Sequence, residues 1–231
     1  MIQVYLLEVV ELRQQMEEII SKGKPLNAEL VPGWDRLALW QQEKVSGCAR
    51  SGTRALCMGG QLLLQYGAHR MLAGENASKE RWEGGISWQK MPFIQLLKGI
   101  PSPLSLQVAY TPKGKPYICH VPWHYNLSHS GDYVALAVSD APVGIDIQQM
   151  RPYREALVER FFSEGEQQSV RGMTLFYTLW CRKEAYGKLK GTGLTEDVLR
   201  RNMLEETGVQ FYEYGEIPGY RICVCSERPV R

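Results

Sequence analysis

Residues 142–150, PVGIDIQQM, place one carboxylate, Asp146, in a run that is otherwise apolar or amide. The pattern predicts a β-strand over residues 143–148, because successive side chains of a strand point to opposite faces. One face of this strand would be apolar, with Val143, Ile145 and Ile147. The other face would present Asp146 and Gln148 about 6.5–7 Å apart, where two oxygen groups can flank one small ion. The competing interpretation is a solvated aspartate at the edge of an ordinary strand.

Working outward from this strand, the order strand, helices, strands is predicted twice. The first series has strands at 2–10 and 133–139 and a buried helix at 53–69. The second has a helix at 173–191 and closing strands at 209–215 and 220–226, and its last strand, YRICVCS, resembles YVALAVS of the first series. We therefore predict an α+β fold of two pseudo-symmetric halves, 1–141 and 142–231. Each half would pack a small antiparallel sheet with helices, and a ligand cleft would lie between the halves.

Composition narrows the class of protein. The chain has 231 residues, 44% hydrophobic and 23% charged, with a formal net charge of +2. The basic residues are scattered, which argues against nucleic acid as a partner. A run of roughly 20 apolar residues that could cross a membrane is absent from the sequence, and the N-terminal segment does not have the pattern of a secretory signal. We expect a cytoplasmic protein, in which six cysteines without a CxxC pair are free thiols and Cys223 and Cys225 are small core residues.

The helix expected at 173–191 carries one stripe at four-residue spacing: Phe176, Trp180, Glu184 and Lys188. The stripe runs from aromatic to charged residues, as if the helix carried a carboxylate from the core into a cleft. A Glu–Lys surface pair would explain the two charged residues equally well, but it would not explain the aromatic residues.

Two predicted turns carry groups that suit phosphate oxygens. In YNLSHSGDY, residues 125–133, Ser128 and His129 precede a glycine turn. In YTPKGKPYI, residues 110–118, Lys115 lies between glycine and proline. An ordinary polar turn and a plain surface loop remain alternatives for these two segments, and Arg54 at the start of the first buried helix is similarly ambiguous.

The order of these motifs resembles that of the 4′-phosphopantetheinyl transferases of the surfactin-synthetase-activating type. The resemblance rests on five motifs: Gly114-Lys115-Pro116, Asn126 to Gly131, Gly144 to Ile147, Phe161-Phe162 with Glu164, and Trp180 to Leu194, which reads WxxKEAxxKxxGxGL. The segments 54–66 and 219–225 also resemble their family counterparts. The match spans most of the chain, with residues 70–105 poorly matched.

The resemblance implies that the chain moves the phosphopantetheine arm of coenzyme A onto a serine of an acyl or peptidyl carrier protein and releases 3′,5′-ADP. It also implies an Mg²⁺ site at Asp146 and Glu184, with Gln148 as a further oxygen donor. Glu184 would be the base for the incoming serine, and Lys188 would neutralise the reacting phosphate. Coenzyme A would be held by Lys115, Ser128, His129, Arg54 and Lys183.

One departure concerns the metal site. Many family members have an acid where this chain has Gln148, so the site loses one negative charge and we expect weaker Mg²⁺ binding.

Lys44 and Arg50 remain open as candidates for binding the 3′-phosphate of coenzyme A. A metal-dependent phosphoesterase and a non-catalytic module that binds coenzyme A or a carrier protein are the alternative functions. A monomer is expected, because both halves lie in one chain.

Overall fold

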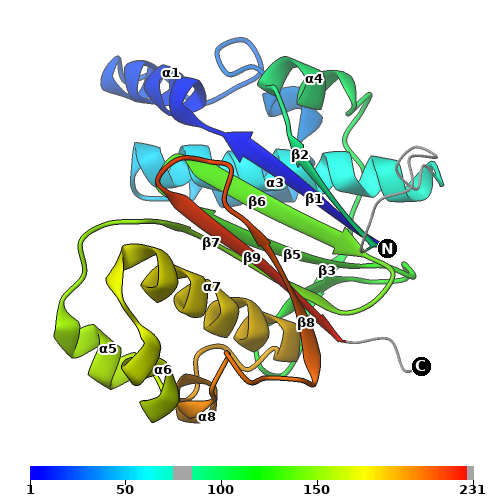
Figure 1. Cartoon of the computed structure of the whole chain (residues 1–231). Helices are drawn as coiled ribbons and strands as arrows, with labels where there is room; N and C mark the ends of the chain where they lie inside the picture. The colour runs from blue at the N-terminus through cyan, green and yellow to red at the C-terminus, as the bar shows by residue number, and fades with distance from the viewer. Residues whose placement is uncertain (75–84, 228–231) are drawn as a thin grey trace. The chain divides into compact units, whose positions relative to one another are not determined.

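A computed structural model of the protein describes residues 1–74 and 85–227 (Figure 1). Helices and strands form an α+β fold, as predicted. In chain order the elements are β1 (Ile2–Glu8), α1 (Val10–Ser21), the short 3₁₀ helix η1 (Trp34–Arg36), α2 (Leu39–Ser46), α3 (Ser51–Leu72), β2 (Ile86–Lys90), α4 (Phe93–Lys98), β3 (Val108–Tyr110), β4 (Pro116–Ile118), β5 (His124–Ser130), β6 (Tyr133–Ser139), β7 (Val143–Gln149), α5 (Glu155–Phe161), α6 (Glu164–Ser169), α7 (Gly172–Lys190), α8 (Glu196–Arg200), β8 (Val209–Tyr214) and β9 (Tyr220–Glu227).

The chain divides into two compact units, and the division is not the one predicted at residue 141. The first unit contains residues 1–107 with 132–136, and the second contains 108–131 with 137–231. Residues 108–131 join the second unit because β5 is bonded to β7 through three of its side chains. Asn126, Ser128 and Ser130 accept hydrogen bonds from the backbone N–H groups of residues 145, 147 and 149, at 2.9, 3.3 and 3.0 Å.

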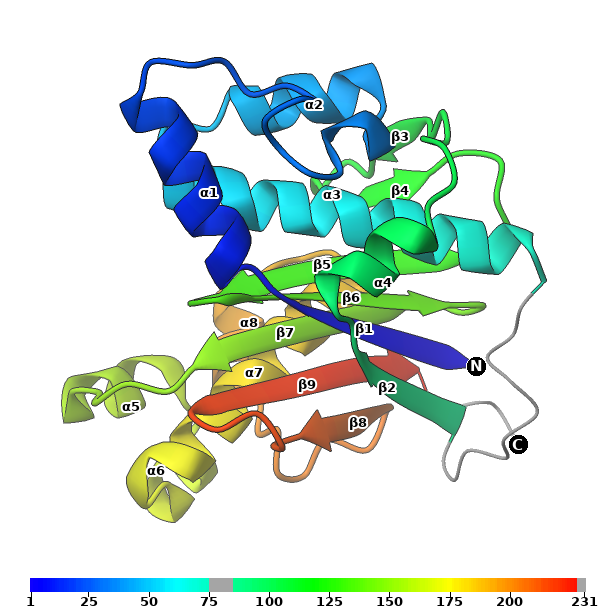
Figure 2. The same ribbon diagram turned by 90° about the horizontal axis from the view of Figure 1, so that it is seen from above.

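In the first unit, β2, β1 and β6 follow one another in the sheet. β1 and β2 pair in parallel, in contrast to the antiparallel pairing expected for this half. The long helix α3 contacts α1, α2 and β1, and Figure 2 shows α1 and α2 beside it. Gly59 in α3 permits the close packing, because a side chain there would collide with Val9.

In the second unit, β7, β9 and β8 form an antiparallel sheet in that order (Figure 2), with Asp146 opposite Cys223. Helix α7 packs against β7 and β9. The core of this unit includes Phe176, and Cys223 and Cys225 lie in it, 1% and 0% exposed. The prediction that these cysteines are core residues is confirmed.

Helix α7 lies unusually close to β7, and this close approach builds the site. A Cβ atom on Gly144 would collide with the backbone oxygen of Ala185 and, at 2.5 Å, with the backbone nitrogen of Leu189. Only glycine fits between strand and helix at this point. The helix ends at Gly191, whose φ of 66° is the left-handed conformation that commonly terminates helices. The end expected from the sequence is confirmed.

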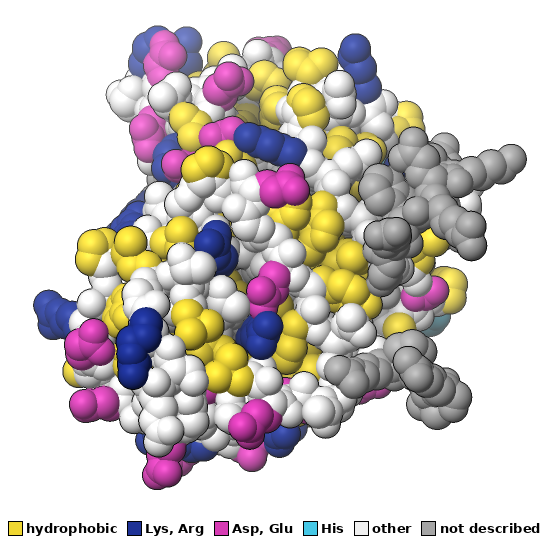
Figure 3. All heavy atoms as spheres, viewed as in Figure 1, with side chains coloured by type: hydrophobic (Ala, Val, Ile, Leu, Met, Phe, Trp, Pro, Cys, Tyr) yellow, Lys and Arg dark blue, Asp and Glu magenta, His cyan; other side chains and the backbone are white. Residues whose placement is uncertain are grey.

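The surface in Figure 3 shows acidic and basic side chains interspersed, without a single large patch of one sign on this face. Within residues 1–74 and 85–227, no helix is both long enough and apolar enough to cross a lipid bilayer. The predicted pseudo-symmetry of the two halves stays a prediction.

Candidate active site

Asp146 is the centre of a compact polar cluster on β7. Asp146 is only 1% exposed. The competing interpretation, a solvated aspartate at the edge of a strand, is therefore wrong. Asp146 Oδ1 accepts a hydrogen bond from Ser128 Oγ at 2.9 Å and an ion-pair contact from Lys188 Nζ at 2.7 Å. A carboxylate buried to this degree needs such partners, because burial without them is costly. The strand and helix predicted to carry Asp146 and Lys188 therefore bring the two residues together.

Ser128 connects three parts of the cluster. Its hydroxyl donates to Asp146, accepts from the Ile147 N–H and accepts from Lys188 Nζ at 2.9 Å. One donor and two acceptor positions are the full capacity of a hydroxyl group. Ser128 can therefore donate to a phosphate oxygen only when its O–H leaves Asp146. It lies in strand β5 and not in the predicted turn, since the side chains of β5 bind the backbone of β7.

Gln148 lies on the same face of β7 as Asp146 and is half-buried. Its Nε2 donates to Asp146 Oδ2 at 3.0 Å, so the second carboxylate oxygen also has a partner. The amide thus holds the orientation of Asp146. The amide nitrogen of Gln148 makes this contact, so its amide oxygen is left as the atom that could face a cation.

Glu184 extends from α7 one turn before Lys188 and is half-buried. Burial is the main cause that raises its pKa, the negative charge of Asp146 raises it further, and Lys188 acts in the opposite direction. Two carboxylates close enough to affect one another in this way form a site of negative charge. The stripe runs from the core toward solvent, as predicted. At its start Phe176 is 3% exposed, and at its end the side chain of Lys188 is 25% exposed.

These oxygen donors fit Mg²⁺. Asp146 and Glu184 supply carboxylates, Gln148 supplies an amide oxygen, and Mg²⁺ prefers few protein ligands of this type together with water and phosphate oxygens. Among the residues that the structure describes, no group of three or more His, Cys, Asp or Glu side chains is arranged to hold a metal ion. The donor set therefore suits a cation that binds together with an anionic substrate better than it suits a closed structural metal site.

Lys115 and His129 belong to the same unit as Asp146. Lys115 Nζ donates to the backbone oxygens of Val143 and Leu189 at 3.2 and 3.0 Å, and burial lowers its pKa. Lys115 also lines a cavity of about 540 Å³ together with residues of the β3–β4 hairpin. His129 is exposed but partly shielded from water, and this loss of hydration, followed by the charge of Lys188, lowers its pKa. A neutral imidazole is thus favoured at pH 7.

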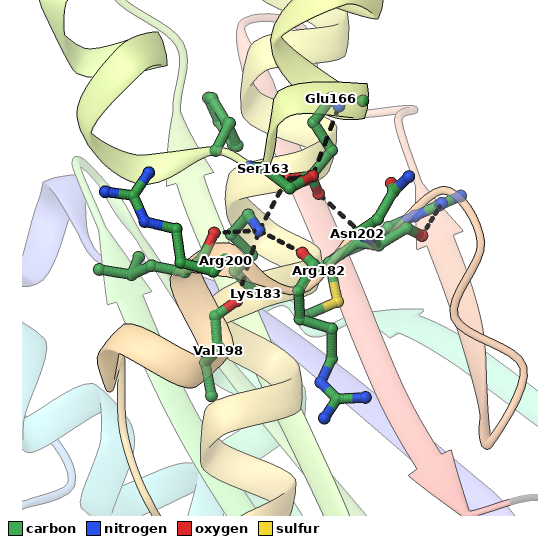
Figure 4. Close-up of polar contacts among 12 residues, drawn as sticks. Ser163, Glu166, Arg182, Lys183, Val198, Arg200 and Asn202 are labelled. Carbon is green, nitrogen blue, oxygen red and sulfur yellow. Dashed lines mark hydrogen bonds and ion pairs between the residues drawn. The ribbon is translucent and has the colours of Figure 1, made fainter.

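Lys183 does not join this cluster. Its side chain is 0% exposed and pairs at 2.8 Å with Glu166 of α6, which is also 0% exposed. Lys183 Nζ further contacts three backbone oxygens, those of residues 198, 199 and 201, at 3.4, 2.8 and 2.7 Å. Figure 4 shows Lys183 and Glu166 pointing toward one another between α7 and the segment around α8. This enclosed position does not fit binding of coenzyme A, so we leave Lys183 out of the proposed site.

Glu166 is a residue that sequence reasoning missed, since Glu164 was taken as the acid that follows Phe161-Phe162. Glu164 is exposed, whereas Glu166 accepts bonds from the Ser163 N–H at 2.8 Å and the Met203 N–H at 2.9 Å. The available signal was Ser163-x-x-Glu166, the capping-box pattern at the start of a helix.

Arg54 lies in the first unit, on α3. Its guanidinium donates to the backbone oxygens of Cys48 at 2.6 Å and Ser46 at 3.4 Å. These bonds join the start of α3 to the end of α2. A role in nucleotide binding stays a prediction.

Part of the second unit, including most of the Asp146 cluster, is similar to a known family. Residues 142–227 match the 4′-phosphopantetheinyl transferase superfamily. This segment includes Asp146, Gln148, Glu184 and Lys188, and the family resemblance predicted from the sequence is confirmed.

Several proteins similar to this chain are named 4′-phosphopantetheinyl transferases. The chain is 40% identical over 136 residues to the 4′-phosphopantetheinyl transferase psf-1 of Bacillus pumilus. The matched region covers 50% of this chain and 58% of that protein. The chain is 30% identical over 142 residues to the 4′-phosphopantetheinyl transferase Sfp of Bacillus subtilis, covering 50% and 61%. It is 35% identical over 132 residues to the 4′-phosphopantetheinyl transferase AcpT of Escherichia coli, covering 53% and 63%. The matches thus span about three fifths of the length of these relatives.

Proposed function

We propose that the chain transfers the 4′-phosphopantetheine arm of coenzyme A to a serine of an apo acyl or peptidyl carrier protein, with Mg²⁺, and releases 3′,5′-ADP. The observation that carries this proposal is the cluster of Asp146, Glu184 and Lys188 inside the segment that matches the superfamily. The names of the similar proteins support the same activity.

The reaction makes an oxygen–phosphorus bond and breaks another. The serine oxygen attacks the β-phosphorus, its proton moves to Glu184, and the bond to the leaving 3′,5′-ADP breaks with negative charge on that group. Glu184 suits the role of base because its pKa is raised above the ordinary value, toward the working pH. Lys188 carries a positive charge to the same place and stabilises the charge that builds on the phosphates.

A bound Mg²⁺ would neutralise and orient the pyrophosphate oxygens. Asp146 and Glu184 would hold it, with Gln148 oriented toward Asp146. His129 is a further group for the phosphates, and Lys115, which lines the cavity of about 540 Å³, is the candidate for holding the part of coenzyme A beyond them. We also retain the expectations that the protein acts as a cytoplasmic monomer and takes no nucleic acid.

The proposal is tested by incubating the protein with coenzyme A, Mg²⁺ and an apo carrier protein, followed by mass spectrometry of the carrier. The expected result is a mass gain of one phosphopantetheine arm and the appearance of 3′,5′-ADP. Binding of coenzyme A without a change in carrier mass would indicate the binding module. Hydrolysis of phosphoesters without transfer would indicate the phosphoesterase.

A matched pair of variants tests the site. Glu184→Gln keeps the shape of the side chain but removes the base and one metal ligand, so transfer should fall by at least about a hundredfold while coenzyme A binding is largely kept. Glu196→Gln changes an exposed acid on α8 and should leave transfer unchanged. Full activity of the Glu184 variant would remove both roles assigned to this residue.

A further inference from the structure

We propose that Lys188 and the divalent cation compete for Asp146, so that metal binding displaces Lys188 from this carboxylate and releases Lys188 to bind phosphate. This inference rests on the proposed function, because it concerns the same site. It assigns to Lys188 a second role, as the cation that holds the site closed before the metal arrives.

The geometry of the contacts points to exchange. Asp146 Oδ1 already accepts from Lys188 Nζ at 2.7 Å and from Ser128 Oγ at 2.9 Å, and Oδ2 accepts from Gln148 at 3.0 Å. Three of the roughly four lone-pair positions of the carboxylate are therefore in use. A cation that is to bind Asp146 closely must share it with these donors or replace one of them.

Charge decides which donor leaves. Lys188 is the charged donor among the three, and a divalent ion close to the same oxygen would repel it strongly in a site as buried as Asp146, which is 1% exposed. Ser128 and Gln148 are neutral and can remain. Lys188 is also free to move, because its side chain is 25% exposed and its two contacts both lie within this cluster.

The consequence for Ser128 follows from its hydrogen bonds. In the closed arrangement its hydroxyl has no unused donor or acceptor position. When Lys188 leaves, its ammonium group regains its donors for phosphate oxygens, whereas Ser128 gains only an acceptor position and keeps donating to Asp146. Lys188 is thus the group released by the exchange, and the site becomes able to bind phosphate through it when the metal is present.

The first test measures Mn²⁺ binding by isothermal titration calorimetry, without coenzyme A, on the wild-type chain and two variants. Lys188→Met should bind Mn²⁺ about tenfold more tightly, the typical size of the effect of one neighbouring charge, although its transfer activity should fall. Lys190→Met removes a lysine from the same helix that pairs with Glu227 and should leave Mn²⁺ affinity unchanged. Affinity of the Lys188 variant within twofold of wild type, weaker binding, or no binding to either protein would overturn the inference.

The second test needs no disruptive variant. The lysine side-chain signals of the wild-type protein are followed by nuclear magnetic resonance during addition of Mg²⁺, with Lys188 assigned from the signal missing in Lys188→Arg. The Lys188 signal should move, while that of Lys183 should stay in place. A stationary Lys188 signal in a protein that transfers phosphopantetheine overturns the exchange and leaves the proposed function standing. A moving signal in a protein that transfers nothing supports the exchange and overturns the proposed function.

Discussion

Helix α7 carries two lysine–carboxylate pairs five residues apart, and their distances are almost the same. Lys183 lies 2.8 Å from Glu166, and Lys188 lies 2.7 Å from Asp146. They differ in what surrounds them. The first pair is 0% exposed on both sides, whereas the second has one buried carboxylate and a lysine that is 25% exposed.

The comparison shows that the length of an ion pair does not reveal its role. Lys183 and Glu166 direct their bonds to backbone groups of α6, α8 and the following turn, so they fix the path of the chain. Lys188 and Asp146 are bonded to side chains, which can be exchanged for a ligand. The enclosed pair determines where the chain runs, and the accessible pair is available for chemistry.

The largest effect is expected for Lys183→Met, because it leaves the Glu166 carboxylate buried without its cation. The free energy of unfolding should fall by about 3–5 kcal/mol. Lys188→Met should cost much less, because Asp146 keeps two neutral donors and water can reach the site. Urea denaturation followed by circular dichroism measures both.

A double variant controls for loss of packing. Lys183→Met with Glu166→Leu replaces the pair by apolar groups and should recover most of the loss. If the single Lys183 variant is as stable as the wild type, or the double variant is worse than the single one, the enclosed pair does not act as described.

The second prediction concerns the contact that brings α7 onto β7. Gly144→Ala places a methyl group against the backbone of Ala185, so strand and helix must separate. We expect a loss of about 1–3 kcal/mol in stability and, because Glu184 moves away from Asp146, weaker Mn²⁺ binding. Gly52→Ala is the matched control, since the added methyl group would meet its nearest neighbour, Arg13, at an ordinary 3.7 Å. Equal effects of the two substitutions would contradict the close-packing argument.

The third prediction concerns Gln148. Gln148→Glu removes a donor to Asp146 and adds a carboxylate beside it, so the Mg²⁺ concentration for half-maximal transfer should fall about tenfold. Gln149→Glu adds the same charge one residue further, where the side chain points to the other face of the strand. A metal requirement that is unchanged in the Gln148 variant, or lowered equally by both, would show that Gln148 is not part of the metal site.

The smallest effect is expected for Lys190→Ala. Its pair with Glu227 at 3.0 Å is exposed to solvent, with side-chain exposures of 36% and 56%. Pairs of this kind contribute less than about 1 kcal/mol and are screened by salt. Thermal melting at low and high salt should show little change, and a loss as large as that of Lys183→Met would break the distinction between enclosed and exposed pairs.

The sequence predicted the parts of the site that depend on periodicity. Alternation identified the strand around Asp146, and four-residue spacing placed Glu184 and Lys188 on one helical stripe. The resemblance placed Lys183 among the groups that hold coenzyme A, but seven residues after Phe176 it lies on the buried face of the same helix. The charge of a lysine suggested a ligand, and its position on the helix indicated burial.

Other features depend on contacts between distant segments. The assignment of residues 108–131 to the second unit could not be predicted, because it depends on side chains of β5 that bind the backbone of β7. Likewise, Glu166 finds its partner 17 residues along the chain in Lys183, and nothing in local periodicity specifies that pairing.

The join between β5 and β7 has a consequence for how this site can vary. Backbone ladders are nearly independent of sequence, but here Asn126, Ser128 and Ser130 supply the acceptors. Mutation of any of these three residues would therefore remove one bond of the join and leave a backbone N–H of β7 without its acceptor. The middle bond is accepted by the Ser128 hydroxyl, which also donates to Asp146. A change at Ser128 would therefore alter both the join and the surroundings of the carboxylate. Single substitutions in β5 can thus change how β5 is held against β7, the strand that carries Asp146.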